Sequence, residues 1–276
     1  FNLAVRGNFD DCQNLVKSMF SDKNFSKQIK MSGVNSINWA RIIAQSVYYF
    51  YSYFLVKNEN KSVNFSVPTG NFGDVYAGYL AKKLGLPINK LIVATNQNDI
   101  LHRAISKGNY EAEKVSETIS PSMDIQIASN FERLIFDLNN EDAVQTSQDM
   151  KKIKDSGKYL LNAQILNKIN ENFLSARLSE KETLEVISTV YKEFSVVLDP
   201  HTAIGYGAFD KHDLNGNNIV LSTAHPSKFP DAIFKAIKTK SDLPNELRYI
   251  LNEKENYDII ENDVEKIKQH IKDRIQ

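Results

Sequence analysis

The stretch SVPTGNFGD, residues 66–74, decides the fold of this sequence. The apolar run at residues 63–67 predicts a buried strand, which Pro68 ends because proline has no N–H group to donate to a neighbouring strand. Residues 75–84 carry apolar side chains at helical spacing, and Gly85 closes that helix. A strand that turns at once into a helix, through a loop with two glycines, is typical of an α/β protein with a parallel sheet.

The turn between this strand and this helix predicts a binding site for a phosphate group. Gly70 and Gly73 permit positive φ angles and a close approach of a ligand to the backbone. Successive N–H groups in such a turn form a concave anion nest, and the start of the helix adds unpaired N–H groups and its dipole. The loop has neither the lysine of GxxxxGK[ST] nor the spacing of GxGxxG, so a nucleotide is not the expected ligand. A tight strand–helix turn without a ligand is the alternative interpretation.

Strands and helices alternate along the rest of the chain, which predicts an open, mainly parallel sheet flanked by helices. Further strands are expected at residues 2–5, 91–94, 195–198 and 219–223, and further helices at residues 10–20, 36–56, 179–194, 202–212 and 264–275. We expect a large α/β domain over residues 1–235, incomplete at its N-terminus, with a mostly helical insertion at about residues 108–178. Residues 236–276 are expected to form a C-terminal helical segment packed on it.

The most apolar part of the chain, residues 39–56, predicts a buried or interface helix. Its strongest apolar stripe falls at i, i+4, i+7 and i+11, at Ile43, Val47, Phe50 and Phe54. Arg41, Gln45 and many tyrosines interrupt the stretch and would be costly in hydrocarbon, so a membrane span is not expected.

The composition argues against several classes of function. Lys+Arg and Asp+Glu both number 34, so the chain has no net charge that favours a nucleic-acid partner. Cys12 is the only cysteine, which rules out a disulfide within this chain and fits a cytoplasmic setting. The histidines show no HExxH pair or other ligand spacing, so we expect no catalytic metal.

At the loop SVPTGNFGD the sequence resembles the threonine synthases, a branch of the fold-type II pyridoxal-phosphate enzymes, which share a fold similar to the tryptophan synthase β subunit. Further segments agree in order and spacing: GNFDDC (7–12), NSINWAR (35–41), ATNQND (94–99), SPSMD (120–124), DPHTAIGY (199–206) and STAHPSKF (222–229). Because these motifs cover nearly the whole chain, the resemblance is specific.

The resemblance implies a cofactor, pyridoxal 5'-phosphate, and residues that would hold it. Its phosphate would lie among Gly70, Asn71, Phe72 and Asp74, bound largely by main-chain N–H groups. The hydroxyl of Thr223 would face the pyridine nitrogen. The resemblance also implies the reaction of a lyase in threonine biosynthesis, which converts O-phosphohomoserine and water to L-threonine and phosphate.

The segment NSINWAR would shape the substrate side of such a site. Ser36 and Asn38 offer hydrogen bonds, and Arg41 offers a planar fork suited to phosphate or carboxylate. The alternative for these residues is a helix cap and a surface ion pair. His201 and His225 follow strand ends in family-like motifs, so each either lines the pocket or is a structural histidine with satisfied hydrogen bonds.

The lysine that carries the cofactor as a Schiff base in this family is missing from the chain. In the family it belongs to a Phe-Lys-Asp-type segment in the N-terminal part, and Lys228 belongs to a different segment without that role. We therefore expect no catalytic residue here, weak cofactor binding, no turnover by the chain alone, and the N-terminal part of the same enzyme as its partner. A proteolytic or cloned fragment, a split gene and a decayed remnant would each give such a chain.

Two other functions compete with this interpretation. One is a non-catalytic threonine synthase-like protein that binds phosphorylated small molecules or a partner chain. The other is a different fold-type II lyase, such as a threonine dehydratase-like protein, against which NSINWAR and DPHTAIGY argue because they match the synthase pattern more closely.

Overall fold

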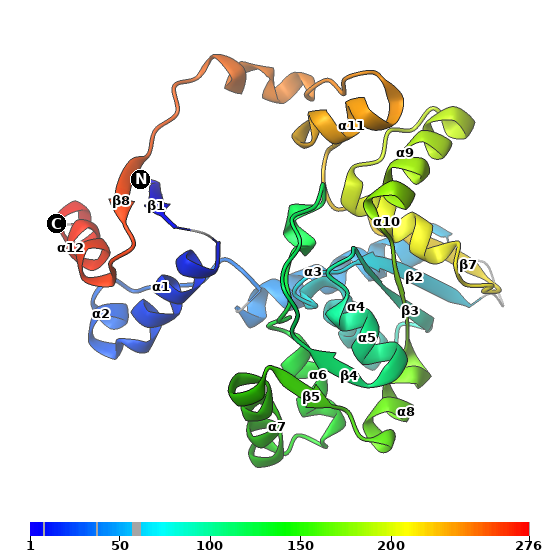
Figure 1. Ribbon diagram of the computed structural model, residues 1–276, viewed down its shortest axis with the longest axis horizontal. Helices are drawn as coiled ribbons and strands as arrows, with labels where there is room; N and C mark the ends of the chain where they lie inside the picture. Colours follow the sequence, from blue (N-terminus) through cyan, green and yellow to red (C-terminus); the bar gives the residue numbers. More distant parts are fainter. Residues whose placement is uncertain (8, 37, 57–61, 276) are drawn as a thin grey trace. The chain divides into compact units, whose positions relative to one another are not determined.

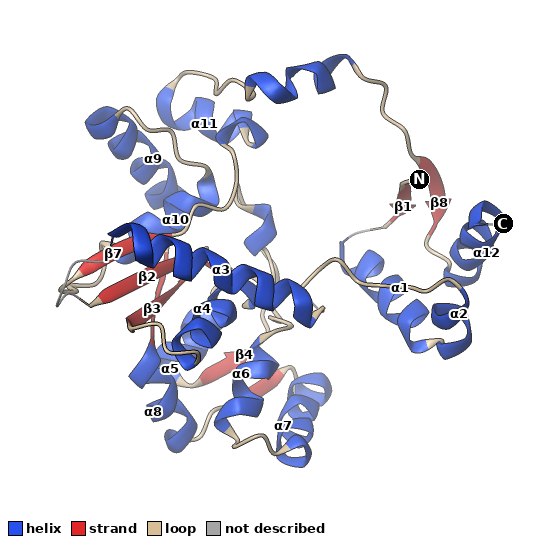
Figure 2. Cartoon of the chain, turned by 180° about the vertical axis from the view of Figure 1, so that it is seen from behind, coloured by secondary structure: helices blue, strands red, loops and turns tan. Residues whose placement is uncertain are grey.

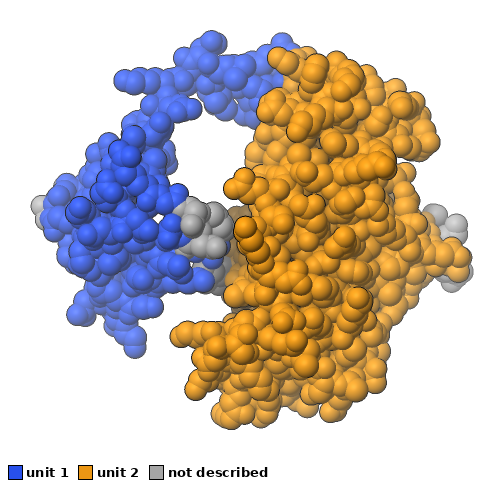
Figure 3. Space-filling view, in the orientation of Figure 1, with its two compact units in different colours: residues 1–34, 243–276 blue, residues 35–242 orange. Residues whose placement is uncertain are grey.

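The computed structural model describes residues 1–7, 9–36, 38–56 and 62–275 (Figure 1). The chain divides into two compact units, one made of Phe1–Val34 with Leu243–Gln276 and the other of Asn35–Asp242 (Figure 3). This division differs from the expected boundary between residues 235 and 236. The physical reason is a parallel pairing of β1 (Leu3–Arg6) with β8 (Asp258–Glu261), which joins the two ends of the sequence.

The smaller unit packs three α-helices beside this strand pair. They are α1 (Phe9–Ser21), α2 (Lys23–Gln28) and α12 (Val264–Ile275). A small apolar core joins them through Leu15, Met19, Phe25 and Ile267. The helix expected at the C-terminus is confirmed, and Lys268 on it pairs with Asp22 at 2.9 Å. The 3₁₀ segment η3 (Asn245–Asn252) also belongs to this unit.

The larger unit is built on a parallel sheet, as expected. Among the described residues its strand order is β6-β3-β2-β7, and every pairing is parallel. The strands are β2 (Val63–Pro68), β3 (Ile88–Thr95), β6 (Phe173–Arg177) and β7 (Asn217–Val220). All residues of β2 are buried, which is typical of a strand covered on both faces.

Helices cover both faces of this sheet, as the cartoon in Figure 2 shows. They are α3 (Trp39–Val56), α4 (Gly73–Lys83), α5 (Ile100–Lys107) and α8 (Ala163–Asn172) on one face and α10 (Pro200–Phe209) on the other. On the outer side of α10, α9 (Glu180–Phe194) and α11 (Pro230–Ile237) form a further layer. Alternate residues of β3 belong to different cores: Leu91 and Val93 to the one under α4 and α5, Ile92 and Ala94 to the one under α10. The capping box expected at the start of α9 is present.

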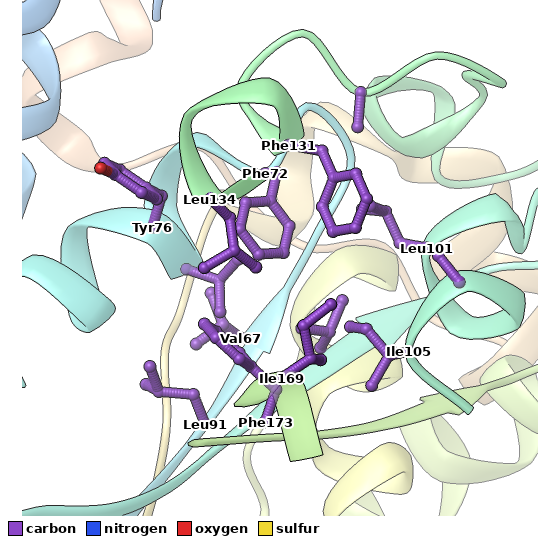
Figure 4. Packing of buried hydrophobic residues seen from close by; sticks show 14 of the residues in the cluster. Val67, Phe72, Tyr76, Leu91, Leu101, Ile105, Phe131, Leu134, Ile169 and Phe173 are labelled. Atoms are coloured by element: carbon purple, nitrogen blue, oxygen red, sulfur yellow. The ribbon is translucent and has the colours of Figure 1, made fainter. Parts of the chain in front are cut away.

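The largest core cluster joins aromatic side chains that are far apart in the sequence, among them Phe72, Phe131 and Phe173 (Figure 4). Phe72 from the glycine loop meets Phe131 at 5.3 Å and Phe173 at 5.8 Å between ring centroids. A smaller layer completes this side: α6 (Phe131–Leu138), α7 (Ala143–Ser156), and the antiparallel pair β4 (Asn109–Glu111) and β5 (Lys158–Leu160). Two 3₁₀ turns, η1 (Pro121–Met123) and η2 (Pro226–Lys228), complete the elements.

Three local expectations differ from the structure. Residues 195–198 form no strand; their apolar side chains Val197 and Leu198 pack with α9 and α11 instead. The segment at residues 108–178 is not only helical, because it contributes β6 to the main sheet. The apolar stripe of α3 is largely exposed, with Val47 at 60% and Phe54 at 58%, while the adjoining face through Tyr49 is buried. No helix in the described part of the chain is long and apolar enough to cross a membrane.

Candidate functional site

The glycine loop lies between the carboxyl end of β2 and the first turn of α4. Thr69 prolongs the strand pairing by one residue, because its N–H donates to the Ala94 carbonyl at 2.8 Å. The chain then reverses through Phe72, whose φ of 65° lies in the left-handed region that glycine usually occupies. The Phe72 side chain is fully buried against Phe131 and Phe173, and this packing holds the unusual backbone conformation in place.

The successive backbone N–H groups from Gly70 to Val75 have no acceptor among the residues that the structure describes. Tyr76 follows this run, and its N–H is the first that is bonded, to the Phe72 carbonyl at 3.1 Å. Phe72 occupies the N-cap position and offers the first turn no side-chain acceptor. Such a run at the positive end of a helix dipole attracts an anion and can donate to several of its oxygens at once.

A second segment packs directly against this loop. A Cβ atom on Gly70 would lie 2.6 Å from the Ser122 carbonyl oxygen, so only glycine allows this approach. Asp124 fixes the turn that carries Ser122. Its carboxylate accepts from the Thr118 hydroxyl at 2.6 Å and from the Asn96 amide at 2.7 Å. The motif SPSMD, which carried no assigned role, therefore forms one wall of the site, and Asn96 of ATNQND supports it from behind.

The loop and this wall border a cavity of about 870 Å³. It lies at the carboxyl edge of the sheet, because Pro68 at the end of β2 and the residues just after β7 line it. Four sequence-predicted residues line it together: Arg41, Gly70, Asp74 and Thr223. Ligands of open α/β folds bind at this edge, and the volume is in the range of small-molecule sites.

Asp74 places a carboxyl group beside the donors, in the first turn of α4. Its Oδ1 accepts a hydrogen bond from the Tyr49 hydroxyl at 3.2 Å, and the same hydroxyl lies 2.8 Å from the Asp74 carbonyl oxygen. Burial raises the pKa of Asp74 from 3.8 to about 6, and the hydrogen bond from Tyr49 offsets only part of this rise. This carboxyl group therefore takes up a proton more readily than an ordinary aspartate does.

A network of hydrogen bonds surrounds Thr223 at another wall of the cavity. The Asp199 carboxylate accepts from the Thr202 hydroxyl through Oδ2 and from the backbone N–H of His201 through Oδ1, at 2.9 Å for the latter. Because the Thr202 hydroxyl donates to Asp199, its oxygen accepts from the Thr223 N–H at 3.1 Å. The Thr223 hydroxyl lies at the limit of hydrogen bonding, 3.5 Å from that of Thr202. Asp199 thus anchors the segment that presents Thr223.

Asn130 links two of the predicted residues and was missed by sequence reasoning. Its Nδ2 donates to the Ser36 hydroxyl at 2.9 Å and to the Asn71 carbonyl at 3.1 Å. The Ser129 hydroxyl also reaches Asn71 Oδ1, at 3.4 Å. An asparagine before a helix normally predicts a cap, but Asn130 makes no side-chain cap bond to α6. No signal in the sequence identified this role.

The other predicted residues divide into those that line the cavity and those that do not. Arg41 lines the cavity from α3, whereas Ser36 and Asn38 are not among the lining residues. Asn38 Oδ1 accepts from the Ala40 N–H at 3.0 Å, the bond expected of a residue at a helix start. His225 makes the corresponding local bond at η2, to the Ser227 N–H at 3.2 Å, and does not line the cavity.

His201 and Lys228 both line the cavity, while the Phe72 side chain points into the core. Phe72 can therefore contribute to the site only through its backbone N–H. In the described part of the chain, no group of three or more His, Cys, Asp or Glu side chains is arranged to hold a metal ion.

Comparison with known proteins identifies relatives of this chain. A family model for the C-terminal part of threonine synthase matches residues 202–271. The threonine synthase of Pseudomonas aeruginosa is 45% identical over 269 residues, which cover 96% of this chain and 57% of that protein. The chain is similar to the C-terminal portion of threonine synthases. The threonine synthase of Saccharomyces cerevisiae is 44% identical, over 99% of this chain and 59% of that protein.

The solved structures give the same result for the fold. The structure of threonine synthase from Brucella melitensis with bound PLP superposes with a TM-score of 0.91 at 44% sequence identity. It covers 98% of this chain, while this chain covers 59% of it. The fold-type II architecture expected from the motifs is thus confirmed, and the chain spans less than two thirds of the length of these relatives.

Proposed function

We propose that this chain is the part of a threonine synthase that binds the phosphate of pyridoxal 5'-phosphate. The complete enzyme converts O-phosphohomoserine and water to L-threonine and phosphate, as a carbon–oxygen lyase acting on phosphates in the cytoplasm. The run of unpaired N–H groups from Gly70 to Val75, at the wall of a cavity that also contains Thr223, carries this proposal. The motif order and the similarity to threonine synthases support it.

The residues present fit this cofactor at its phosphate group and at its pyridine nitrogen. Main-chain donors suit a phosphate dianion, and the loop from Gly70 through Asn71 and Phe72 to Asp74 supplies them in succession. The Thr223 hydroxyl, an uncharged partner, would meet the pyridine nitrogen without holding it protonated as a carboxylate would. When bound, the cofactor supplies an electron sink that stabilises carbanions. The chain's own contribution is to bind and orient it.

Arg41 is the residue that we assign to the substrate. It lines the cavity from α3, and a guanidinium group donates two parallel hydrogen bonds to phosphate or carboxylate. Asn130 holds Ser36 beside the loop, so we also place Ser36 on the substrate side. Asn38 has a local bond that a helix start explains, and it is proposed only as a support for this segment.

We propose that the lysine of the Schiff base comes from the part of threonine synthases that this chain does not match. An exposed apolar surface on α3 adjoins the cavity, and it includes Val47 and Tyr51, which also line the cavity and are 60% and 66% exposed. Phe54 and Leu55 extend it, at 58% and 68% exposure. A contiguous apolar surface of this kind marks a contact site. Its occupant in our proposal is that unmatched part of the enzyme, which would close the cavity and exclude water.

Titration of the full chain with inorganic phosphate, followed by backbone NMR, tests the phosphate site. We expect shifts at the N–H groups from Gly70 to Val75. Gly70→Val should abolish them, because the new side chain collides with the Ser122 carbonyl. Gly73→Ala is a milder second variant, whose Cβ would lie 3.1 Å from Ser36 Cβ, and Gly85→Asn at the far end of α4 is the control. Unchanged binding by both loop variants would show that the phosphate site is misassigned.

A second experiment tests the reaction itself. The chain is combined with the N-terminal part of the Pseudomonas aeruginosa threonine synthase that it does not match, and phosphate release from O-phosphohomoserine is measured. We expect release from the combination and none from either part alone. A combination that binds pyridoxal 5'-phosphate but releases no phosphate would instead favour a non-catalytic, threonine synthase-like protein.

A further inference from the structure

Two of the described residues that line the cavity have a buried side-chain atom without a partner, namely Gln45 through Oε1 and His201 through Nε2. His201 is the one whose second polar atom has a charged partner. The side chain is only 4% exposed and lines the cavity, next to Phe229 at 5.0 Å between ring centroids. Its Nδ1 lies 3.0 Å from Asp199 Oδ1, whereas its Nε2 has no hydrogen-bond partner among the described residues. Buried polar atoms in native proteins are nearly always paired, so this nitrogen needs an explanation.

Asp199, the partner of His201 Nδ1, determines whether Nε2 donates or accepts a hydrogen bond. Burial alone would raise the pKa of Asp199, but the hydrogen bonds from His201 and Thr202 outweigh it and hold the pKa below 3.8. The Asp199 carboxylate is therefore ionised near neutral pH and can only accept hydrogen bonds. It follows that His201 Nδ1 carries a proton, and that Nε2 is the acceptor whenever the ring holds that proton alone.

His212 provides a comparison within the same chain. Its Nε2 also lacks a partner, but the residue is only partly buried and does not line the cavity. Both nitrogens are buried, but only that of His201 belongs to a residue at the wall of the cavity. A molecule bound in the cavity is the partner that the position of His201 allows.

We propose that His201 Nε2 accepts a hydrogen bond from a hydroxyl or ammonium group of the molecule bound in the cavity. Asp199 acts as its positioning residue. The same carboxylate holds Thr202, and through it the segment of Thr223, so one buried anion orients both polar contacts on this wall. The inference rests on the proposed function, since it takes the bound molecule to be a phosphorylated amine or amino acid with its phosphate at the glycine loop.

Nitrogen NMR of the full chain labelled with ¹⁵N-histidine tests this inference with two probes. Pyridoxamine 5'-phosphate carries a phosphate, a hydroxyl and an ammonium group, and it has no aldehyde that would react with surface lysines. Inorganic phosphate carries the phosphate alone. Without a probe we expect the Nδ1–H tautomer at His201, and a smaller fraction of it in Asp199→Asn. Pyridoxamine 5'-phosphate should shift the Nε2 signal of His201, and inorganic phosphate should not.

Affinities of the variants complete the test. His201→Asn should weaken pyridoxamine 5'-phosphate about three- to tenfold, the effect of one hydrogen bond, and leave inorganic phosphate unchanged. His212→Gln, the matched control, should change neither. Shifts at Gly70 to Val75 without a response at His201, or an equal response at His212, would overturn the inference and leave the proposed function standing. If neither probe shifts any signal at concentrations of several mM, both fail.

Discussion

Replacement of Asp74 by asparagine is expected to stabilise the larger unit at neutral pH. The carboxyl group is buried in the first turn of α4, with the Tyr49 hydroxyl as its side-chain hydrogen-bond donor. Asparagine keeps an acceptor for Tyr49 and removes the charge, which burial penalises. Asp74 therefore lowers the stability of the folded chain at neutral pH, although it lies beside the proposed phosphate site.

The magnitude follows from the pKa. In the folded chain the pKa of Asp74 is raised from 3.8 to about 6. A group whose folded pKa is raised binds its proton more tightly when folded, so its contribution to stability falls as the pH rises from about 4 to about 6. This pKa shift lowers the free energy of unfolding by about 3 kcal/mol above this pH range and does not change it below the range. Because the new amide must find partners of its own, we expect a gain of about 1–3 kcal/mol for Asp74→Asn at pH 7.5.

Urea denaturation at a series of pH values measures this effect. Trp39 is the only tryptophan and belongs to the same unit as Asp74, so its fluorescence reports the unfolding of that unit. The stability difference between Asp74→Asn and the parent chain should be largest above pH 7 and vanish near pH 3. A difference that does not depend on pH, or a variant less stable at pH 7.5, would refute the reasoning about burial.

Two further predictions concern packing and charge elsewhere in the larger unit. Gly78→Ala should lower the free energy of unfolding by about 1–3 kcal/mol in urea denaturation, because the added Cβ would lie 2.4 Å from Tyr49 Cε1. This overpacking outweighs the better helix propensity of alanine. An unchanged urea midpoint would contradict the prediction. Glu182→Gln should lower stability at pH 7, because hydrogen bonds from Lys211 and Ser179 lower the pKa of Glu182 to about 2. The contribution of Glu182 is fully present above about pH 4.5 and is lost as the pH falls through about 2, so the difference in thermal unfolding should shrink steadily over this range and be mostly gone at pH 2.

The sequence predicted the sheet where local signals and tertiary packing agree. The strand before the glycine loop, the helix after it and the capping box at Ser179 were all evident from short-range patterns. Strand β6 was missed because its five residues gain their strand conformation from pairing with β3, which no local pattern records. Residues 195–198 have the composition of a strand, but Ser195 has a left-handed conformation at the end of α9, and Val197 and Leu198 pack between helices.

In the candidate site too, the residues with a local sequence signal were predicted and those set by distant contacts were not. The glycines of the loop were predicted from positive φ angles and a close approach to the backbone. The close approach is present at Gly70, but the left-handed residue of the loop is Phe72 and not a glycine. Asn130 and Asp124 were not predicted, because their partners are distant in sequence or belong to other loops. Phe72 was assigned to the phosphate by its place in the motif, yet its side chain belongs to the core, so only its N–H is available to a ligand.

Helix α3 connects the proposed phosphate site to the proposed contact surface. Tyr49 on its buried face donates to Asp74 and packs against Gly78, so the position of α3 sets the surroundings of the one carboxyl group beside the phosphate donors. Its exposed face carries Val47 and Tyr51, which also line the cavity. An anion bound at the loop is repelled by ionised Asp74, and burial lowers the cost of neutralising that group by a proton. Whatever covers the exposed face of α3 and excludes water there also favours the neutral form, so covering this surface and binding phosphate should assist each other.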